Sequence, residues 1–490
     1  MRNLVLLLAA TAVALSPAAL PAQSSVRYLD PREVAEAQKQ HAELIAEYGG
    51  AETGARGAYV ESVGRRVATY SGVANAGAAF HFTTLNSAVE NAFAVPGGYI
   101  YITRQLMTLM DDESQLAFAL GHETGHIAAN HARARQSVAR RNSVQGVFGA
   151  LLGSLLGGGI GSAIAQMSQQ RAQLATLGFS RDQEYQADTL GTRYMIAAGY
   201  DPAGGPGILA ALTRATALQA RVQGRTNRQT PEWASTHPLS ENRLQRALAG
   251  ARATGRLGTG MRNRNQFLAQ LQGITIDDDP AQGIIEGRSF THPDLKIQFS
   301  VPPGYLMQNS THAVTIKGSA GQAQFSGGRY GGRIENYIYQ VFQQLTGGRQ
   351  QLMVPPPQRT TINGLPAAFT TARANTSSGA IDVSVVAYQW SPNTIYHFIM
   401  LTQGGAGVSP FAPMVNSLRR ISPAEAAAIR PRVIEVVTVR PGDTAQSMAG
   451  RMAYRDFQLD RFLTINGLWA GARLTPGQKV KLIVYGARRS

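Results

Sequence analysis

Apolar residues dominate the stretch from Leu116 to Ala129, and a short polar group interrupts them at His122, Glu123 and His126. The pattern predicts a helix that is apolar on nearly every side. Unpaired charge in such a helix would be costly, because burial removes a charged group from water. The polar group therefore needs a partner, and it is the first candidate for a functional site.

Strand patterns occur on both sides of this helix. Apolar side chains gather at 93–95 and 99–102 around a proline and two glycines at 96–98, which predicts two strands joined by a turn or bulge. Farther along, a helix pattern at 334–345 interrupts a series of strand patterns. These later strands are predicted at 297–301, 314–316, 383–388 and 395–400.

The chain has 490 residues, which is too many for one ordinary core, and changes in composition predict three folded units. Its net charge of +16 comes mainly from arginine, including a cluster between Arg133 and Arg141 that suits an anionic lipid or cell-wall surface. A general bias toward arginine explains the charge equally well. We expect no nucleic-acid partner, because no nucleic-acid motif is present.

The first residues predict a secretory signal peptide at 1–22. A short positive start precedes an apolar run from Leu4 to Leu15, and small residues follow before Gln23. The apolar run is too short for a comfortable membrane span. The sequence contains no cysteine, which excludes disulfides and the lipid-bearing cysteine of a bacterial lipoprotein. We therefore expect a periplasmic protein that is soluble or peripherally bound to membrane or cell wall.

The polar group in the first helix has the spacing of a metal site. His122 and His126 are four residues apart, so on a helix they lie roughly 40° apart and can face one Zn²⁺. Glu123 would stand beside the metal as general base, which makes metal-assisted hydrolysis the expected reaction. Two surface histidines flanking a glutamate are the alternative, and the apolar surroundings argue against it.

A third metal ligand is available downstream. Glu184 and Asp188 are also four residues apart, so on a second helix they would share one face. Glu184 could then bind the metal, while Asp188 could hydrogen-bond the distal nitrogen of a zinc-binding histidine. A solvated charged helix is the alternative for this segment.

Four separated blocks within residues 28–250 resemble the gluzincin-type metalloendopeptidases, a family that includes HtpX, BepA and the CAAX prenyl endopeptidases. The blocks are 91–102, 122–126, 184–188, and 235–238 with Arg243. The resemblance implies one zinc ion per chain. The roles that it implies are zinc ligands at His122, His126 and Glu184, a base at Glu123, supporting positions at Asp188 and Arg243, and an active-site place for His237.

His237 has two candidate roles. It could donate a hydrogen bond to the oxyanion, as Tyr185 could. By its resemblance to periplasmic relatives, it could instead occupy the fourth zinc position and hold the enzyme latent. His131 lies five residues after His126, roughly 140° around a helix, so we expect it at the helix surface and pointing away from the metal.

Asn91, Ala92, Phe93 and Ala94 form the expected substrate-binding strand. In the enzyme class that the chain resembles, an edge strand beside the zinc helix accepts the substrate as an added strand. Cleavage would then be directed at extended or unfolded polypeptide. An ordinary hairpin within the sheet is the alternative.

The apolar stretch at 147–165 carries glycines at a spacing of four, which on a helix would form one smooth ridge. Three consecutive glycines at 157–159 would weaken such a helix. We expect a helical hairpin or lid that touches the bilayer peripherally or covers the cleft. A tight contact between helices of the soluble domain is the alternative.

Two further units are expected after the peptidase region. Residues 285–420 resemble a Mog/PsbP-type α/β sandwich, and residues 433–485 resemble a LysM module, a family that commonly binds N-acetylglucosamine-containing glycans. We expect residues 433–490 to hold the chain near peptidoglycan without contributing to chemistry, whereas a docking domain without sugar affinity is the alternative. The basic residues that suit an anionic wall polymer are Arg440, Arg451, Arg473, Lys479 and Lys481.

The sequence therefore predicts a multidomain α+β protein. Its expected parts are a signal peptide at 1–22, a mainly helical zincin-type metallopeptidase domain with a small edge sheet at 23–265, a linker at 266–284, the α/β sandwich at 285–420 and a LysM-like βααβ domain at 433–485. The expected function is a periplasmic zinc metalloendopeptidase that cleaves unfolded or misassembled envelope proteins in protein quality control. The alternative is a wall-bound chaperone or scaffold with a latent or silent zinc site, although a scaffold would not need Glu123.

Overall fold

The computed structural model describes residues 27–132, 179–222, 224, 237, 241–346, 352–376 and 379–487. The expected signal peptide and the glycine-rich stretch at 147–165 lie outside these residues. No helix in the described part of the chain combines the length and the hydropathy that a membrane span requires.

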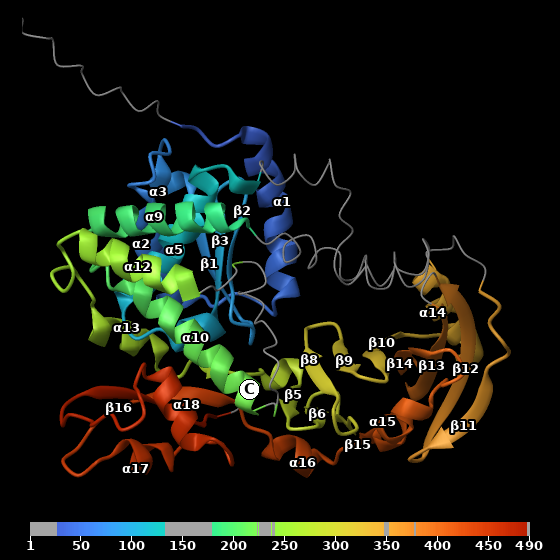
Figure 1. Cartoon of the computed structure of the whole chain (residues 1–490). Coiled ribbons are helices and arrows are strands. Elements are labelled where there is room, and N and C mark those ends of the chain that lie inside the picture. Colours follow the sequence, from blue (N-terminus) through green and yellow to red (C-terminus); the bar gives the residue numbers. More distant parts are fainter. Residues whose placement is uncertain are drawn as a thin grey trace, which may run out of the picture.

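The first region is mainly helical and surrounds a small sheet (Figure 1). Its helices are α1 (Pro31–Glu47), α2 (Gly54–Ala68), α3 (Ala76–Ala79), α4 (Arg104–Leu109), α5 (Glu113–Ala128), α9 (Arg181–Ala197), α10 (Gly204–Val222), α12 (Glu241–Ala253) and α13 (Arg264–Leu271). Its strands are β1 (His81–Leu85), β2 (Ala92–Val95) and β3 (Tyr99–Thr103), in the spatial order β1-β3-β2. The multidomain α+β organisation with a helical first region is thereby confirmed.

Strand β2 lies at the edge of this sheet. It pairs antiparallel with β3, and the two strands are joined by a turn in which Gly97 and Gly98 have φ of 102° and 96°. Only glycine adopts such angles without strain, which explains the pair of glycines after Pro96. The two predicted strands and their turn are confirmed, and β2 has one side free of β3.

Helix α5 is the apolar helix that the sequence predicts. It begins after Asp112, whose carboxylate accepts hydrogen bonds from the backbone N–H groups of Ser114 and Gln115. The side chains from Glu113 to Ile127 are all buried, so α5 runs through the core of the first region.

Residues 280–428 build a second unit of two sheets. One sheet has the order β15-β7-β6-β5, and the other has the order β11-β12-β13-β14-β10-β9-β8. The strands are β5 (Ile284–Glu286), β6 (Ser289–His292), β7 (Ile297–Ser300), β8 (Leu306–Asn309), β9 (Val314–Gly318), β10 (Gly321–Arg329), β11 (Gln358–Ile362), β12 (Leu365–Thr376), β13 (Gly379–Ser391), β14 (Thr394–Gln403) and β15 (Arg419–Arg420). The helices are η1 (Pro280–Gln282), α14 (Ile334–Thr346), η2 (Ser409–Phe411), α15 (Ala412–Ser417) and α16 (Pro423–Ala428). The four strands and the helix that the sequence predicts here are confirmed.

The last unit has the predicted order of strand, helix, helix and strand. Its elements are β16 (Arg432–Thr438), α17 (Ala445–Ala449), α18 (Gln458–Ile465) and β17 (Lys479–Tyr485). Strand β16 pairs antiparallel with β17 on one side and with β4 (Thr275–Ile276) on the other. Both β4 and the buried face of α13 belong to the segment expected as a linker, so this segment is structured and joins the last unit to the first.

One hydrophobic core extends from the first region into the last unit, which lies beneath α10 in Figure 1. Leu116 of α5 and Ile434 of β16 both belong to this cluster. Lys481 of β17 has a fully buried side chain, and its Nζ donates to the carbonyl oxygens of Thr108 at 3.0 Å and Met110 at 2.6 Å. The last unit is therefore packed onto the segment that leads into α5, and Lys481 is unavailable to the surface role expected for it.

Candidate metal centre

Two glycines let α5 and α9 pack with their backbones in contact. A Cβ placed on Gly191 would lie 2.8 Å from the backbone nitrogen of His122, and one placed on Gly121 would lie 3.2 Å from the Cα of Gly191. The first distance is too short for a larger residue without a shift of the helices, and the second is tighter than most Cβ contacts. This close crossing brings Glu184 and Asp188 of α9 beside the two histidines of α5.

Four buried side chains converge at this crossing. His122, His126, Glu184 and His237 each offer one potential ligand atom, and these atoms all lie within 4.8 Å of one another. The Nε2 atoms of His122 and His126 are 3.0 Å apart, and Nε2 of His126 is 3.5 Å from Oε1 of Glu184. The three residues predicted as zinc ligands therefore lie together.

His237 completes the cluster. Its Nδ1 lies 3.3 Å from Nε2 of His122 and 3.0 Å from Oε1 of Glu184, whereas its Nε2 lies 3.5 Å from Oε1 of Glu123. His237 is the one described residue of the block at 235–238. Its two ring nitrogens thus face different groups, the predicted ligands on one side and the predicted base on the other.

The spacing of these donor atoms fits a tetrahedral metal ion. Zinc binds imidazole nitrogen and carboxylate oxygen at about 2.0–2.2 Å, which places tetrahedral ligand atoms about 3.3 Å apart. The distances among the donors of His122, His126, Glu184 and His237 are 3.0–3.5 Å along the contacts just given. The residue types also fit, since two histidines and one glutamate form a known catalytic zinc set.

Glu123 is suited to the role of a base. Its side chain is buried beside the ligands, and its Oε2 has no hydrogen-bond partner among the described residues. Burial raises the pKa of the Glu123 carboxyl above its ordinary value. A carboxylate with a higher pKa holds an abstracted proton more firmly, which favours general base catalysis.

Asp188 and Arg243 support the cluster from behind. Oδ1 of Asp188 is 2.9 Å from Nδ1 of His122, and Arg243 donates to both carboxylate oxygens of Asp188 at 2.7 and 2.8 Å. Nη1 of Arg243 also lies 2.7 Å from Oε2 of Glu184. Burial alone would raise the pKa of Asp188, but hydrogen bonds with Arg243 and His122 hold this pKa well below its ordinary value. Asp188 therefore remains a carboxylate that orients His122.

The expectation for His131 is wrong. His131 is 3% exposed, and its Nδ1 lies 2.8 Å from Nδ1 of His126. Helix α5 ends at Ala128, and Asn130 has a φ of 56°, so the chain turns back instead of continuing the helix. The asparagine in the sequence was the available signal, because asparagine often adopts this conformation just after a helix.

Tyr185 is placed differently from His237. Its ring lies 4.1 Å from the guanidinium carbon of Arg246 on α12, which engages the tyrosine in a cation–π contact. This leaves His237 as the stronger candidate of the two for a contact with a reacting group.

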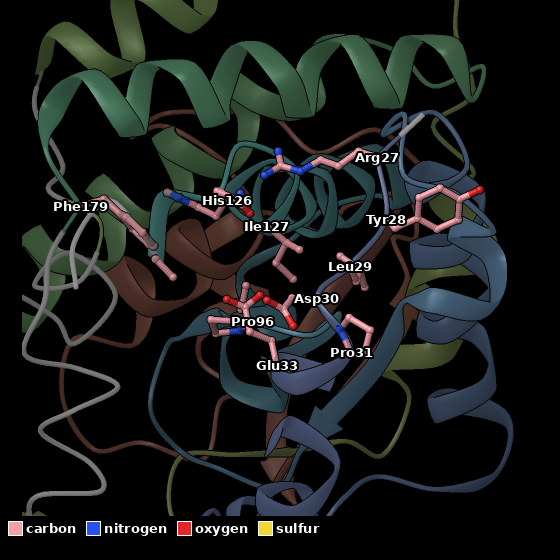
Figure 2. A pocket seen from close by; sticks show the side chains of 13 residues that line it. Arg27, Tyr28, Leu29, Asp30, Pro31, Glu33, Pro96, His126, Ile127 and Phe179 are labelled. Carbon is pink, nitrogen blue, oxygen red and sulfur yellow. The ribbon is translucent and has the colours of Figure 1, made fainter. Parts of the chain in front are cut away.

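A pocket of about 390 Å³ adjoins the cluster at His126 (Figure 2). The figure shows His126 and Phe179 at one end of the pocket and Tyr28 at the opposite end. The rings of Phe179 and His126 stack with a centroid distance of 3.6 Å. Ala94 of β2 also lines the pocket, so the predicted substrate-binding strand and the metal cluster border the same space.

Residues 54–251 match the family described as Peptidase family M48. The beta-barrel assembly-enhancing protease of Yersinia pestis is 32% identical over 195 residues, which cover 39% of this chain and 37% of that protein. The mitochondrial metalloendopeptidase OMA1 of Arabidopsis thaliana is 28% identical over 167 residues, which cover 34% of this chain and 30% of that protein. The chain thus spans about a third of the length of these curated relatives.

A solved structure is similar to part of this chain at a low level. The solution structure of cyanobacterial PsbP from Synechocystis sp. PCC 6803 matches with a TM-score of 0.23 and 11% identity, covering 27% of this chain and 91% of that one. A score this low carries no conclusion, so the PsbP-like fold of residues 285–420 stays a prediction, as does the LysM-like fold of residues 433–485. The family match and the buried cluster concern a different part of the chain, residues 54–251, and this region is similar to peptidase family M48.

Proposed function

We propose that this chain is a periplasmic zinc-dependent metalloendopeptidase that cleaves unfolded or misassembled envelope proteins. The observation that carries the proposal is the set of four buried donors within 4.8 Å of one another, with Glu123 beside them. The M48 match and the relatives named as proteases support the same reaction class. His122, His126 and Glu184 would hold one zinc ion per chain.

The side chains around the cluster have separate roles in the proposed hydrolysis. A bound zinc ion would acidify a coordinated water and polarise the scissile carbonyl. Glu123 takes the proton from the attacking water and passes it to the leaving amine. Asp188 keeps the proton of His122 on Nδ1, which leaves Nε2 with its lone pair toward the metal. Arg243 keeps Asp188 ionised through two hydrogen bonds.

His237 supports a latent resting state. Its Nδ1 lies among the zinc donors at distances that fit a fourth ligand, so it would occupy the position that a catalytic zinc leaves open for water. Cleavage would then require His237 to move away. Once displaced, the same ring would stand near the place where the oxyanion forms.

Strand β2 pairs with β3 alone among the described residues, and this free edge supports binding of an extended polypeptide. The backbone N–H of Thr103 donates to the carbonyl oxygen of Asn91, so this pair of residues is hydrogen-bonded. Backbone groups alternate sides along an antiparallel strand, which turns those of Phe93 toward β3 and those of Ala92 and Ala94 toward the free edge. A substrate strand would therefore pair with Ala92 and Ala94, and Asn91 and Phe93 would hold the strand in the sheet.

The cellular setting of the proposal comes from the sequence and from the relatives' name. The signal-peptide pattern at 1–22 supports export to the periplasm, and the name of the bacterial relatives refers to β-barrel assembly. We include peptidoglycan as a second partner through residues 433–485, where Trp469 is 73% exposed. Peripheral membrane contact through 147–165 is a further part of the proposal, and nucleic acid is no part of it.

Purified residues 23–490 test the proposal together with Glu123→Gln. We expect about one zinc per chain in both proteins and cleavage of unfolded casein by the wild type alone. The amide fills the same space as the carboxylate but cannot accept the proton, and loss of a general base costs about 10²–10⁴-fold in rate. A zinc-loaded wild type that binds casein without cleaving it would support the scaffold alternative instead.

A further inference from the structure

A chain of three side chains links the end of α5 to α9 through one predicted zinc ligand. Nδ1 of His126 lies 2.8 Å from Nδ1 of His131, and Nε2 of His131 lies 3.0 Å from Oε1 of Gln186. Gln186 follows Glu184 by two residues on the helix that carries this third ligand. The turn at Asn130 is what brings His131 back to His126.

The positions of the protons follow from the contacts. Nε2 of His126 faces the other donors at 3.0 and 3.5 Å, so it must carry a lone pair to bind a metal, and the ring proton resides on Nδ1. This Nδ1–H donates to His131, whose Nδ1 must accept. The proton of His131 is then on Nε2, where it donates to the amide oxygen of Gln186. Each donor in the chain meets an acceptor.

The two zinc-binding histidines are therefore oriented by different partners. His122 contacts the carboxylate of Asp188, whereas His126 contacts a neutral imidazole. Phe179 stacks on the face of the His126 ring and limits its tilt, but stacking alone leaves the two ring nitrogens equivalent. The contact with His131 is what distinguishes them.

We infer that His131 and Gln186 are positioning residues that fix the tautomer and the rotation of His126 for metal binding. The inference rests on the proposed zinc chemistry. Partners in the second shell of a zinc-binding histidine typically contribute about 10–100-fold in metal affinity. His131 acts through His126 and touches neither substrate nor metal.

A matched pair of substitutions at His131 separates orientation from packing. His131→Phe keeps the ring volume but removes the acceptor, whereas His131→Asn offers an amide oxygen near the position of Nδ1. We expect His131→Phe to weaken zinc affinity by about 10–100-fold and His131→Asn to restore most of it. Zinc affinity is measured by chelator competition. In the metal-free protein, long-range ¹H–¹⁵N NMR should show one His126 tautomer in the wild type and a mixture in His131→Phe.

A second pair of variants protects the test against misfolding at His131. Gln186 is exposed, so the fold should tolerate changes there. Gln186→Glu supplies a stronger acceptor for His131 and should raise zinc affinity, while Gln186→Leu removes the acceptor and should lower it. If Gln186 had a purely structural role, the two substitutions would not be expected to change zinc affinity in opposite directions.

Three results would overturn the inference. They are unchanged zinc affinity in His131→Phe, equal losses in His131→Phe and His131→Asn, or changes of the same sign in the two Gln186 variants. All these measurements are made without substrate. A wild type that binds zinc tightly but never cleaves casein would therefore overturn the peptidase proposal and leave the role of His131 standing.

Discussion

His237 is in contact with both the metal donors and the base, because its two ring nitrogens point to different groups. Nδ1 lies 3.0 Å from Glu184, and Nε2 lies 3.5 Å from Glu123. With a zinc ion bound by the proposed ligands, a ring in this position would leave no room for a water molecule between the ion and Glu123. On the proposed function, the same residue would limit the reaction as a cap on the metal or assist it as a donor to the oxyanion.

Replacement of His237 by alanine distinguishes these effects. If the ring caps the metal in about 90–99% of molecules, His237→Ala should cleave casein about 10–100-fold faster than the wild type, while its zinc affinity falls because one ligand is lost. Initial rates at saturating zinc measure the first effect, and chelator competition measures the second. His312→Ala, at an exposed position in the second unit, is the control and should match the wild type. A roughly 10²-fold slower His237→Ala would assign the residue to the oxyanion instead.

At the scale of elements, the role proposed for the edge of β2 can be tested at one backbone N–H group, that of Ala94. Ala94→Pro removes the N–H that we assign to the free edge, and proline is tolerated on edge strands when its nitrogen faces away from the sheet. Losing one hydrogen bond to the substrate, at about 0.5–1.5 kcal/mol, should lower kcat/KM for casein about 3–10-fold.

Ala94→Ser retains the N–H and serves as the matched control. Zinc content and thermal unfolding should be the same in both variants, because neither the ladder with β3 nor the metal ligands change. Equal activity of Ala94→Pro and the wild type would place the substrate elsewhere than along β2.

Local patterns predicted the elements of the site but not every contact between them. The spacing of His122 and His126, and of Glu184 and Asp188, identified two helix faces, and the four-residue cluster combines ligands from both. The predicted direction of the His131 side chain was wrong because it assumed a continuous helix, whereas α5 ends at Ala128. The pairing of β4 with β16 joins residues far apart in sequence, and a two-residue strand has no detectable periodicity.

At the scale of the whole molecule, the last unit shares one hydrophobic core with the first region. Ile434, Phe462 and Leu482 are fully buried in the same cluster as the side chains of α5. Burial lowers the pKa of Lys481 to about 8, and its ammonium group is held by two carbonyl oxygens and by Asp111. Lys481 could not be recognised as buried from the sequence, where it lies among basic residues.

Deletion of residues 433–490 should therefore damage the peptidase, contrary to the expectation of a separable wall-binding module. We expect the truncated chain to lose cooperative unfolding and zinc binding together. Lys481→Ala in the full chain is the milder test and should cost about 2–4 kcal/mol of unfolding free energy, because it leaves buried polar groups without their partner. Urea unfolding measures this cost. A truncated chain that retains zinc and casein cleavage would restore the module interpretation.

A carboxyl group at the boundary between the first region and the last unit also makes the free energy of unfolding depend on pH. Glu90 and Asp277 line a cavity of about 210 Å³ between α10 and the last unit. Burial, assisted by the charge of Asp277, raises the pKa of Glu90 to about 7. The folded chain therefore binds this proton more tightly than the unfolded chain, so the group costs stability as the pH rises from about 4.5 to 7.

Glu90→Gln should remove this cost. At pH 8 we expect the variant to be more stable than the wild type by about 1–3 kcal/mol, because one pKa unit corresponds to about 1.4 kcal/mol. At pH 4 the two proteins should be nearly equal. Urea unfolding at both pH values measures the difference, and a variant that is equally or less stable at pH 8 would contradict the assignment.

Strand β17 lies near the end of the sequence, so the core around the buried cluster can be completed only late in synthesis. The ribosome makes residues 479–485 long after it has made α5 with His122, Glu123 and His126. Until β17 emerges, the carbonyls of Thr108 and Met110 lack the ammonium group that binds them, and the core below the zinc helix is incomplete. A nascent chain thus contains His122, Glu123 and His126 before it contains the residues that complete the core around them. On the proposed function, the order of synthesis would therefore keep the site incomplete until the last unit, whose unfolded segments would be substrates, has folded.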